Sequence, residues 1–486
     1  MGIEIPKIVL GVIGPEVVLV VAGIGIMLGE VVVKGEERRH LVWIGIAGVV
    51  GALVVGLGLW GKEYVGGFGG LVVVDRFSSF IGIVYLIGSG LTLLISRGYM
   101  ERRGEEAGEY YMLILFSTVG MLLMSRAVDL IMVFIGLEVL SISIYILCGY
   151  FRDRKGIESA LKYFLLGAFS SGILLYGIAL VYGAVGGTGF KEIGEAVSRG
   201  SGGWMLWSGI GLVLVGFGFK AAVVPFHMWV PDVYEGAPAP VTGYMSVGVK
   251  AAAFAVLMRV VGEVLFVGGG SSSGSEVWRQ LLVVGSVLTM SVGNIGALLQ
   301  DNIKRMLGYS SIAHAGYILI GVLVGGEIGW SGVMYYLLVY TLMNLGAFGV
   351  VVMVGGRGEE RVNIGDYAGV GRRYPVLGAV MAVFMFSLAG VPPFSGFVGK
   401  FYIFSGAVKA GYVWLAVVGV INSVVSVYYY LRVTVMMYMK EGGAEGVEFD
   451  GAVVLAVAVA VIFTVQMGVF PSLYLQLAKN SIKALL

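Results

Sequence analysis

Long apolar runs recur along the whole chain, and they limit the possible folds more than any other feature of the sequence. Each run of about 18 or more residues is long enough to cross a hydrocarbon core of about 30 Å as an α-helix. Membrane-spanning strands would instead appear as short segments of alternating hydrophobicity. Hydrophobic residues make up 58% of the 486 residues, a share well above that of soluble domains. The sequence therefore predicts an all-α, polytopic membrane protein.

Charged residues and clusters of proline and glycine divide these runs into about 14 predicted spans. The opening MGIEIPKIVLGVIGPE has acidic residues and no small-residue cleavage site, so we expect no removable signal peptide. The stretch GGGSSSGS, residues 268–275, is expected to form a flexible loop. The predicted spans cover residues 16–33, 41–60, 77–96, 109–125, 128–150, 157–184, 204–229, 239–263, 277–300, 303–325, 330–354, 375–408, 412–438 and 451–470.

The distribution of lysine and arginine between the spans predicts an orientation. These residues are more frequent in the connections that follow odd-numbered spans than in the others. Because positively charged connections stay in the cytoplasm, we expect the odd-numbered connections there. With an even number of spans, both termini then lie on the outer side of the membrane.

Four charged residues fall inside predicted spans at membrane depth: Glu138, Lys220, Lys250 and Lys400. A charge in the hydrocarbon core costs several kcal/mol, so it must be paired or hydrated inside the bundle. For any one of them, a structural salt bridge between helices is an alternative. Three lysines cannot all pair with one carboxylate, however, and this surplus favours groups that gain and lose protons.

Two of these lysines lie beside expected helix breaks. Lys220 is followed by Pro225 and Pro231, and Lys400 is preceded by SLAGVPP, which contains Pro392 and Pro393. Proline removes a backbone hydrogen bond and kinks a helix. Broken helices at membrane depth occur where protein or a watery cavity satisfies the freed backbone groups, and they are typical of ion sites in transporters. A packing kink is the structural alternative.

The other charged residues within spans, Lys162, Arg259 and Arg432, are near span ends, where we expect their side chains to snorkel towards the head groups. The single cysteine, Cys148, cannot hold an iron–sulfur cluster, and three histidines leave little for a haem. We therefore expect no cofactor on this chain. The formal net charge of +2 gives no indication of nucleic-acid binding.

Four motifs carry a resemblance to a known family. They are FKAAVVPFHMWVPDVYEGAPAPVTGYMSVGVKAAAF at 219–254, SALKYFLLGAFSSGILLYG at 159–177, DNIKRMLGYSSIAHAGYILIG at 301–321 and FSLAGVPPFSGFVGKFYIF at 386–404. Together they resemble the antiporter-like N subunit of proton-pumping NADH:quinone oxidoreductase, respiratory complex I, and its photosynthetic counterpart, the B subunit of the plastoquinone-reducing complex. The PDVYEGAP element is more similar to the N subunit than to the L and M subunits or to the D subunit of sodium/proton antiporters.

The resemblance implies a single membrane domain of 14 helices with two inverted five-helix repeats and broken helices in spans 7 and 12. The first three helices would occupy residues 1–105, the repeats residues 106–265 and 276–440, and the last helix and tail residues 441–486.

The resemblance also implies residue roles. Glu138, Lys220, Lys250 and Lys400 would form a charged axis along the membrane midplane, and His314 would belong to a watery link between Lys250 and Lys400. His227 and Lys162 are secondary candidates. We expect the His227 side chain to be a hydrogen-bonding partner near a helix end and near the membrane surface.

A proton-translocating subunit of a quinone-reducing complex in the bacterial inner membrane is the function that the resemblance implies. The M and K subunits would be neighbours in the bilayer, and FMN, iron–sulfur clusters and quinone would be bound by partner subunits. Two alternatives stay open: a cation/proton antiporter subunit of a multi-subunit exchanger, and a membrane scaffold whose buried charges are structural.

Overall fold

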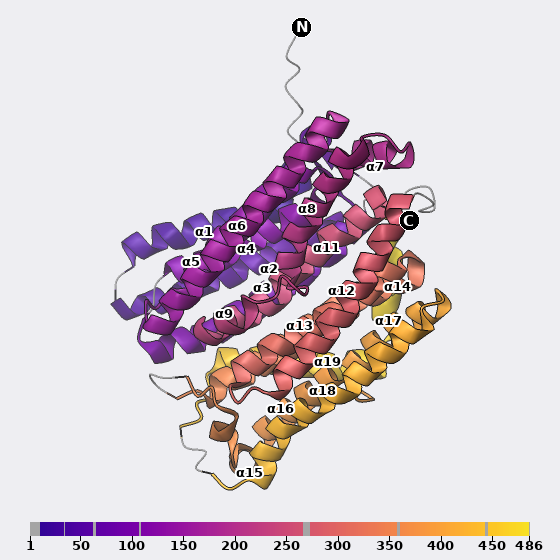
Figure 1. The fold of residues 1–486 in the computed structure, drawn as a ribbon. Coiled ribbons are helices and arrows are strands. Elements are labelled where there is room, and N and C mark those ends of the chain that lie inside the picture. Colours follow the sequence, from indigo (N-terminus) through magenta and orange to yellow (C-terminus); the bar gives the residue numbers. More distant parts are fainter. Residues whose placement is uncertain are drawn as a thin grey trace.

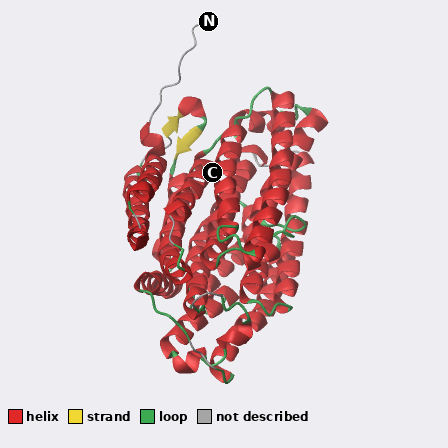
Figure 2. Ribbon diagram, turned by 90° about the vertical axis from the view of Figure 1, so that its left-hand side faces the viewer, coloured by secondary structure: helices red, strands yellow, loops and turns green. Residues whose placement is uncertain are grey.

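The computed structural model describes residues 10–485, apart from residues 34, 62–64, 106–107, 266–272, 357–359 and 443–445. The described residues form a bundle of long helices that run side by side (Figure 1). Short connections lie at the two ends of the bundle (Figure 2). Among these residues, 13 helices are long and apolar enough to cross a membrane. The prediction of an all-α polytopic protein is confirmed.

The elements of the first part of the chain run up to residue 265. They are η1 (Leu10–Ile13), α1 (Gly14–Val32), η2 (Gly35–His40), α2 (Leu41–Leu59), β1 (Val65–Gly67), η3 (Phe68–Gly70), β2 (Val72–Val74), α3 (Arg76–Arg103), α4 (Gly108–Arg126), α5 (Leu130–Cys148), α6 (Arg154–Val185), α7 (Phe190–Ser198), α8 (Gly203–Ala221), α9 (Val230–Gly236), α10 (Ala239–Tyr244), the π-helical turn η4 (Met245–Val249), α11 (Lys250–Val260) and the π-helical turn η5 (Val261–Leu265).

The elements of the second part follow residues 266–272. They are α12 (Ser273–Leu298), α13 (Ile303–Val324), α14 (Gly326–Val354), η7 (Ile364–Tyr367), α15 (Val370–Arg373), α16 (Pro375–Ala389), α17 (Ser395–Lys409), α18 (Val413–Met439), α19 (Gly451–Val469) and α20 (Ser472–Ile482). Most of the Gly/Ser-rich stretch expected as a loop lies outside the described residues, and its last residues belong to the first turn of α12.

The predicted spans agree with the observed helices in number and position, and the two predicted breaks are present. In the seventh span, helical structure stops at Ala221 and resumes at Val230. The twelfth span consists of α16 and α17, each of 15 residues and therefore too short to cross alone. Three features were not predicted: the antiparallel β1–β2 hairpin at one end of the bundle (Figure 2), the amphipathic helix α7 and the terminal helix α20.

Side-chain caps fix where several of the long helices begin. An aspartate or asparagine directly before the helix accepts hydrogen bonds from the first free backbone N–H groups, which have no partner within the helix. Asp129 accepts from the N–H groups of Ile131 and Met132 at 2.8 and 3.3 Å. The residues with this role are Asp75, Asp129, Asp153, Asn302 and Asp450.

Helix α14 lies in the interior of the bundle. It packs against α3, α13, α16, α17, α19 and α20, and all its residues from Gly329 to Val354 are buried. Helices α6, α12 and α18 instead carry exposed apolar side chains such as Phe169, Val284 and Val424. In a membrane-spanning bundle these faces are turned to lipid. The buried polar side chains described in the next subsection therefore lie inside the bundle, away from lipid.

Candidate functional site

The break after α8 is stabilised by side chains from neighbouring segments. Ala222 adopts a left-handed conformation with φ of 59°, which ends the helix, and Pro225 has no backbone N–H to continue it. The Trp229 indole N–H donates to the Phe219 carbonyl at 3.0 Å, and the backbone N–H of Val224 donates to Thr289 Oγ1 at 3.0 Å. These two side chains thereby form hydrogen bonds with backbone groups that have no helical partner, and the break is kept open.

Lys220 lies in the last turn of α8 and is 1% exposed. Its Nζ donates to Tyr145 Oη at 3.2 Å and lies 5.1 Å from the ring centroids of both Tyr145 and Tyr163. Aromatic faces and a hydroxyl oxygen stabilise a cation without adding a counter-charge. Within the described residues, no carboxylate forms an ion pair with Lys220.

Glu138 lies in the middle of α5 and is half-buried. Ser171 Oγ of α6 donates to Glu138 Oε1 at 2.5 Å. Glu138 precedes Tyr145 by seven residues, which places the two side chains on the same face of α5. Tyr145 therefore contacts Lys220 and shares a helix face with Glu138, whereas Glu138 and Lys220 do not form a direct ion pair.

Lys250 is the first residue of α11, directly after the π-helical turn η4, and it is 3% exposed. Its Nζ donates to Ser311 Oγ of α13 at 2.7 Å. A π-helical turn adds a residue to one helical turn and is frequent at functional sites. The lysine thus points across the bundle to α13, where the next predicted site residue lies.

His314 of α13 is buried between two tyrosine hydroxyl groups. Its Nδ1 lies 2.5 Å from Tyr336 Oη and its Nε2 lies 2.9 Å from Tyr430 Oη. Tyr430 Oη also lies 2.5 Å from Ser310 Oγ, next to the serine that contacts Lys250. Because an imidazole and a hydroxyl group can each donate and accept, this chain of groups suits proton transfer.

Lys400 of α17 lies in the second break. Its Nζ donates to the carbonyls of Leu388 and Ala389, both at 3.0 Å, and to Ser423 Oγ at 2.9 Å. These carbonyls belong to the last residues of α16 and have no partner further along that helix. They also form the negative end of the helix dipole, which favours a cation. The ammonium lies 4.8 Å from the Tyr317 ring centroid.

The structure brings the predicted site residues together in two groups. Lys250 contacts Ser311, and the adjacent residue Ser310 contacts Tyr430, which in turn contacts His314. The Tyr317 ring lies 5.7 Å from the His314 ring and 4.8 Å from the Lys400 ammonium. Glu138 and Lys220 form the other group around Tyr145. Among the described residues, no direct hydrogen-bond chain joins Lys220 to Lys250.

Lys162, a secondary candidate, is 40% exposed and lies at the edge of the bundle. It forms ion pairs of 2.7 Å with both Glu158 and Asp232, and Arg305 contacts Asp232 at 2.7 Å. Burial raises the pKa of the Asp232 carboxyl, but the hydrogen bonds from Lys162 and Arg305 outweigh burial and hold the pKa below its ordinary value. These ion pairs are on the periphery, away from the lysines of the interior.

His227 lies in the connection between α8 and α9, and its backbone carbonyl accepts from the N–H of Val230 at 3.0 Å. Its Nδ1 is buried and has no hydrogen-bond partner among the described residues. The expected position beside a helix end is therefore observed, whereas the expected side-chain hydrogen bond is not found at this nitrogen.

The prediction that Arg259 snorkels is wrong. Its side chain is 1% exposed, and it forms ion pairs with Asp75 at 2.8 Å and with Glu263 at 3.2 Å. Arg259 Nε also donates to the Ser125 carbonyl at 3.0 Å. The sequence position of Arg259 near a span end did not reveal Asp75, the residue directly before α3, as its partner, because the two residues are far apart in the chain.

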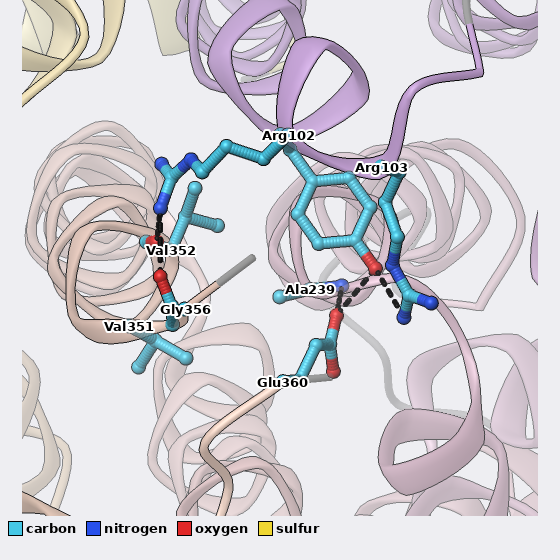
Figure 3. A pocket seen from close by; sticks show the side chains of 9 residues that line it. Arg102, Arg103, Ala239, Val351, Val352, Gly356 and Glu360 are labelled. Atoms are coloured by element: carbon cyan, nitrogen blue, oxygen red, sulfur yellow. Dashed lines mark hydrogen bonds between the residues drawn. The ribbon is translucent and has the colours of Figure 1, made fainter. Parts of the chain in front are cut away.

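A second polar cluster, which the sequence analysis did not identify, surrounds Glu360. Its carboxylate accepts from Tyr99 Oη at 2.7 Å and from the Ala239 N–H at 2.9 Å, and it forms an ion pair of 2.5 Å with Lys304. Figure 3 shows Glu360 facing Ala239 and the Arg103 side chain. Burial raises the pKa of Glu360, but Lys304 and these hydrogen bonds outweigh it and hold the pKa below its ordinary value.

No group of three or more His, Cys, Asp or Glu side chains within the described ranges is placed to hold a metal ion. Cys148 is buried, and its Sγ lies 3.5 Å from Met245 Sδ. Separately from this, the buried lysine, histidine, tyrosine and serine groups described above can donate or accept protons.

Three comparisons show what this chain is similar to. Residues 127–426 match the family described as NADH:quinone oxidoreductase/Mrp antiporter. The chain is 50% identical over 479 residues to the NADH-quinone oxidoreductase subunit N of Trichlorobacter lovleyi, covering 98% of this chain and 97% of the relative. It is 42% identical to the subunit N of Chloroflexus aggregans, covering 100% and 99%. A chain of respiratory complex I from Thermus thermophilus, determined with bound aureothin, is 33% identical with a TM-score of 0.81, covering 95% and 98%.

Proposed function

The chain belongs to the N-subunit family of NADH:quinone oxidoreductases, and from this premise we propose that it is a proton-translocating membrane subunit of such a complex. It couples quinone reduction on partner subunits to proton movement through Glu138, Lys220, Lys250, His314 and Lys400. The observation that carries the proposal is that its three buried lysines are held by neutral oxygen atoms and aromatic rings.

Neutral surroundings suit a lysine that must change its charge. A lysine paired with a carboxylate is strongly favoured in its charged form, whereas burial among neutral groups favours the uncharged form. Lys220 and Lys400 contact groups that stabilise a cation only partly. The free energies of the charged and neutral forms can then lie close together, which is what a proton carrier requires.

Glu138 is the group that shifts this balance. Approach of its carboxylate towards Lys220 favours the protonated lysine, and withdrawal favours release of the proton. Ser171, which donates to Glu138 Oε1, and Tyr145, which accepts from Lys220, position the two groups. Protons released by Lys220 pass to Lys250 through water, because the described residues provide no direct hydrogen-bond chain there.

His314 then relays protons between Lys250 and Lys400. Lys250 contacts Ser311, and the adjacent Ser310 contacts Tyr430 beside the imidazole, so the step between the two serines passes through water. The Tyr317 ring separates the imidazole from Lys400. In each step an ammonium or hydroxyl group donates its proton to a lone pair of the next oxygen or nitrogen atom. The donor then receives a new proton from the group before it. His227 and Lys162 are secondary members. His227 Nδ1, which has no hydrogen-bond partner within the described part of the chain, lies in the first break, and Lys162 fixes α6 to Asp232 of α9.

The two halves of the chain are two inverted five-helix repeats, residues 106–265 and 276–440. Helix α4 packs against α5 as α12 packs against α13, and each half contains one broken helix beside a buried lysine. This correspondence supports the division into repeats. Residues 1–105 and 441–486 flank them within a single membrane domain.

The subunit lies in the bacterial inner membrane with both termini on the outer side, next to the M and K subunits. The excess of lysine and arginine in odd-numbered connections supports the orientation. FMN, iron–sulfur clusters and quinone belong to partner subunits; for the clusters this is supported by the single cysteine of the chain, which cannot hold one.

Purification of the native chain from its own membrane tests this function. Co-isolation with flavin and iron–sulfur subunits, together with quinone reduction coupled to proton uptake in proteoliposomes, is the expected result. Isolation with other antiporter subunits alone, and cation-dependent proton exchange without quinone reduction, would contradict the proposal in favour of the antiporter alternative.

A further inference from the structure

One face of α3 carries polar side chains along almost its whole length. Their positions are separated by 7, 4, 3, 4 and 3 residues, a spacing that keeps side chains on one face of a helix. All are buried, and the most exposed of them, Tyr99, is 6% exposed. These residues, called here the α3 polar face, are Ser78, Tyr85, Ser89, Thr92, Ser96 and Tyr99.

The α3 polar face is as long as the membrane is thick. Tyr99 follows Ser78 by 21 positions, which corresponds to a rise of about 31 Å at 1.5 Å per residue, and the hydrocarbon core is about 30 Å thick. It lies on a different helix from Glu138, Lys220, Lys250, His314 and Lys400. Its polar groups therefore form a second line across the bundle, independent of the site described above.

Helices α4 and α10 supply hydroxyl groups that extend this line. Ser89 Oγ lies 2.5 Å from Thr118 Oγ1, which lies 2.7 Å from Tyr244 Oη, and Ser117 Oγ donates to the same tyrosine at 2.9 Å. Nearer the end of α3, Ser96 Oγ lies 3.3 Å from Tyr110 Oη. A hydroxyl group can accept one proton while donating another, so it can serve as a step of a proton relay.

One end of the line opens into a cleft. Tyr99 Oη donates to Glu360 at 2.7 Å, and both residues line a cleft of ≈ 370 Å³ together with Arg103. Figure 3 shows the Arg103 and Glu360 side chains from a neighbouring pocket, which they line together with Arg102 and Ala239. A polar cleft of this volume has room for several water molecules. Protons in water can therefore reach the first hydroxyl of the α3 polar face.

The other end of the line stops at Arg259. Tyr85 Oη is buried without a hydrogen-bond partner among the described residues, and the Ser78 N–H donates at 2.7 Å to Asp75, the carboxylate that also holds Arg259. Asp75 and Glu263 hold the guanidinium at 2.8 and 3.2 Å. A guanidinium group has five N–H donors and no acceptor, and it stays charged at every accessible pH. It can therefore neither accept a proton from a hydroxyl group nor release one.

We propose that the α3 polar face, with the hydroxyl groups of α4 and α10, is a second proton path across the membrane that Arg259 keeps closed. Protons would pass from the Glu360 cleft along the hydroxyl groups, with water molecules between groups too far apart for a hydrogen bond. Asp75 and Glu263 position the arginine where the line would otherwise continue. An arginine that excludes protons from a pore is a known device in channels.

The test measures passive proton leak, which needs no quinone chemistry and is therefore independent of the proposed function. The complex carrying Arg259→Met is reconstituted in proteoliposomes, an acid pulse is applied, and the decay of the pH gradient is followed. We expect the leak rate to rise at least about tenfold, the change that a barrier lower by about 1.4 kcal/mol produces. Adding Tyr244→Phe to this variant should return the leak towards wild type, because the central hydroxyl relay is then interrupted.

Arg126→Met is the matched control. Arg126 is 2% exposed and forms a buried ion pair of 2.6 Å with Glu16, but it does not lie on the α3 polar face. The control should lose a comparable ion pair without a rise in leak. If Arg259→Met does not assemble, Arg259→Gln with Asp75→Asn removes both charges together and keeps a capping residue for α3.

Three outcomes would overturn the proposal. They are an assembled Arg259 variant with wild-type leak, an equal leak in the Arg126 control, and a leak unaffected by Tyr244→Phe. In each of these cases the hydroxyl groups only join helices α3, α4 and α10, as serine and threonine do in many membrane bundles.

Discussion

Replacement of Lys220 by arginine separates a proton carrier from a fixed structural charge. Arginine keeps the positive charge and can donate to Tyr145 Oη, as Lys220 does at 3.2 Å. It cannot release its proton at accessible pH. We expect Lys220→Arg to assemble into the complex and to pump protons poorly.

The size of the effect follows from the two cations and their shared surroundings. The ordinary pKa values of lysine and arginine differ by at least about two units, so deprotonating arginine costs at least about 3 kcal/mol more. Lysine and arginine at position 220 would have the same neutral partners, Tyr145 and the Tyr163 ring at 5.1 Å. The surroundings therefore do not cancel the difference in deprotonation free energy. A barrier higher by about 3 kcal/mol slows turnover at least about hundredfold.

The assay compares wild type, Lys220→Arg and Lys220→Met in proteoliposomes of the purified complex. Proton uptake and quinone reduction are recorded together, and both variants should lose them. Lys479→Arg, which alters a partly exposed lysine paired with Glu327 at 3.3 Å, is the matched control and should leave both rates unchanged. Near-normal pumping by the arginine variant would refute the carrier role and leave a structural cation as the better explanation.

Three further predictions test other parts of the site. Glu138→Gln keeps the size and the contact with Ser171 but removes the charge, so proton uptake should fall at least about tenfold while the complex still assembles; normal uptake would exclude Glu138 as the switch. Ser423→Ala removes one of the three acceptors of Lys400, worth about 1 kcal/mol, and should slow pumping several-fold; an unchanged rate would mean that this hydrogen bond does not position the lysine. The Glu360 carboxyl has a pKa below its ordinary value, so its stabilising effect is present above about pH 4.3 and is lost as the pH falls through its folded-state pKa. The thermal stability of wild type should therefore drop more steeply below pH 4.3 than that of Glu360→Gln, and parallel curves would contradict this ionisation.

The spans and both helix breaks were predictable because each depends on local properties of the chain. Apolar length gives the spans, and Pro225, Pro392 and Pro393 lie in the interruptions themselves. Helix α7 was not predicted, because its nine residues carry too few apolar side chains to resemble a span. The β1–β2 hairpin was not predicted because each of its strands has only three residues, too few to show an alternating pattern.

Individual site residues were predictable from their chemistry, but their partners were not. A lysine inside an apolar run is evident in the sequence, as Lys250 and Lys400 show. That Ser311 and Ser423 accept from them depends on how α13 and α18 pack, and the sequence contains many serines in apolar runs. Arg259 was expected near a span end, although its tertiary contact with Asp75 buries it.

The enclosed position of α14 has a consequence for how the chain is assembled in the membrane. Four of the helices that cover α14 are synthesised after it: α16, α17, α19 and α20. Helix α14 must therefore first be inserted into lipid without them. Its apolar composition allows this, since it is one of the helices long and apolar enough to cross a membrane. The same side chains must then exchange lipid contacts for protein contacts as the later helices arrive. A polar substitution in α14 would therefore impair insertion during synthesis, before any effect on the finished bundle.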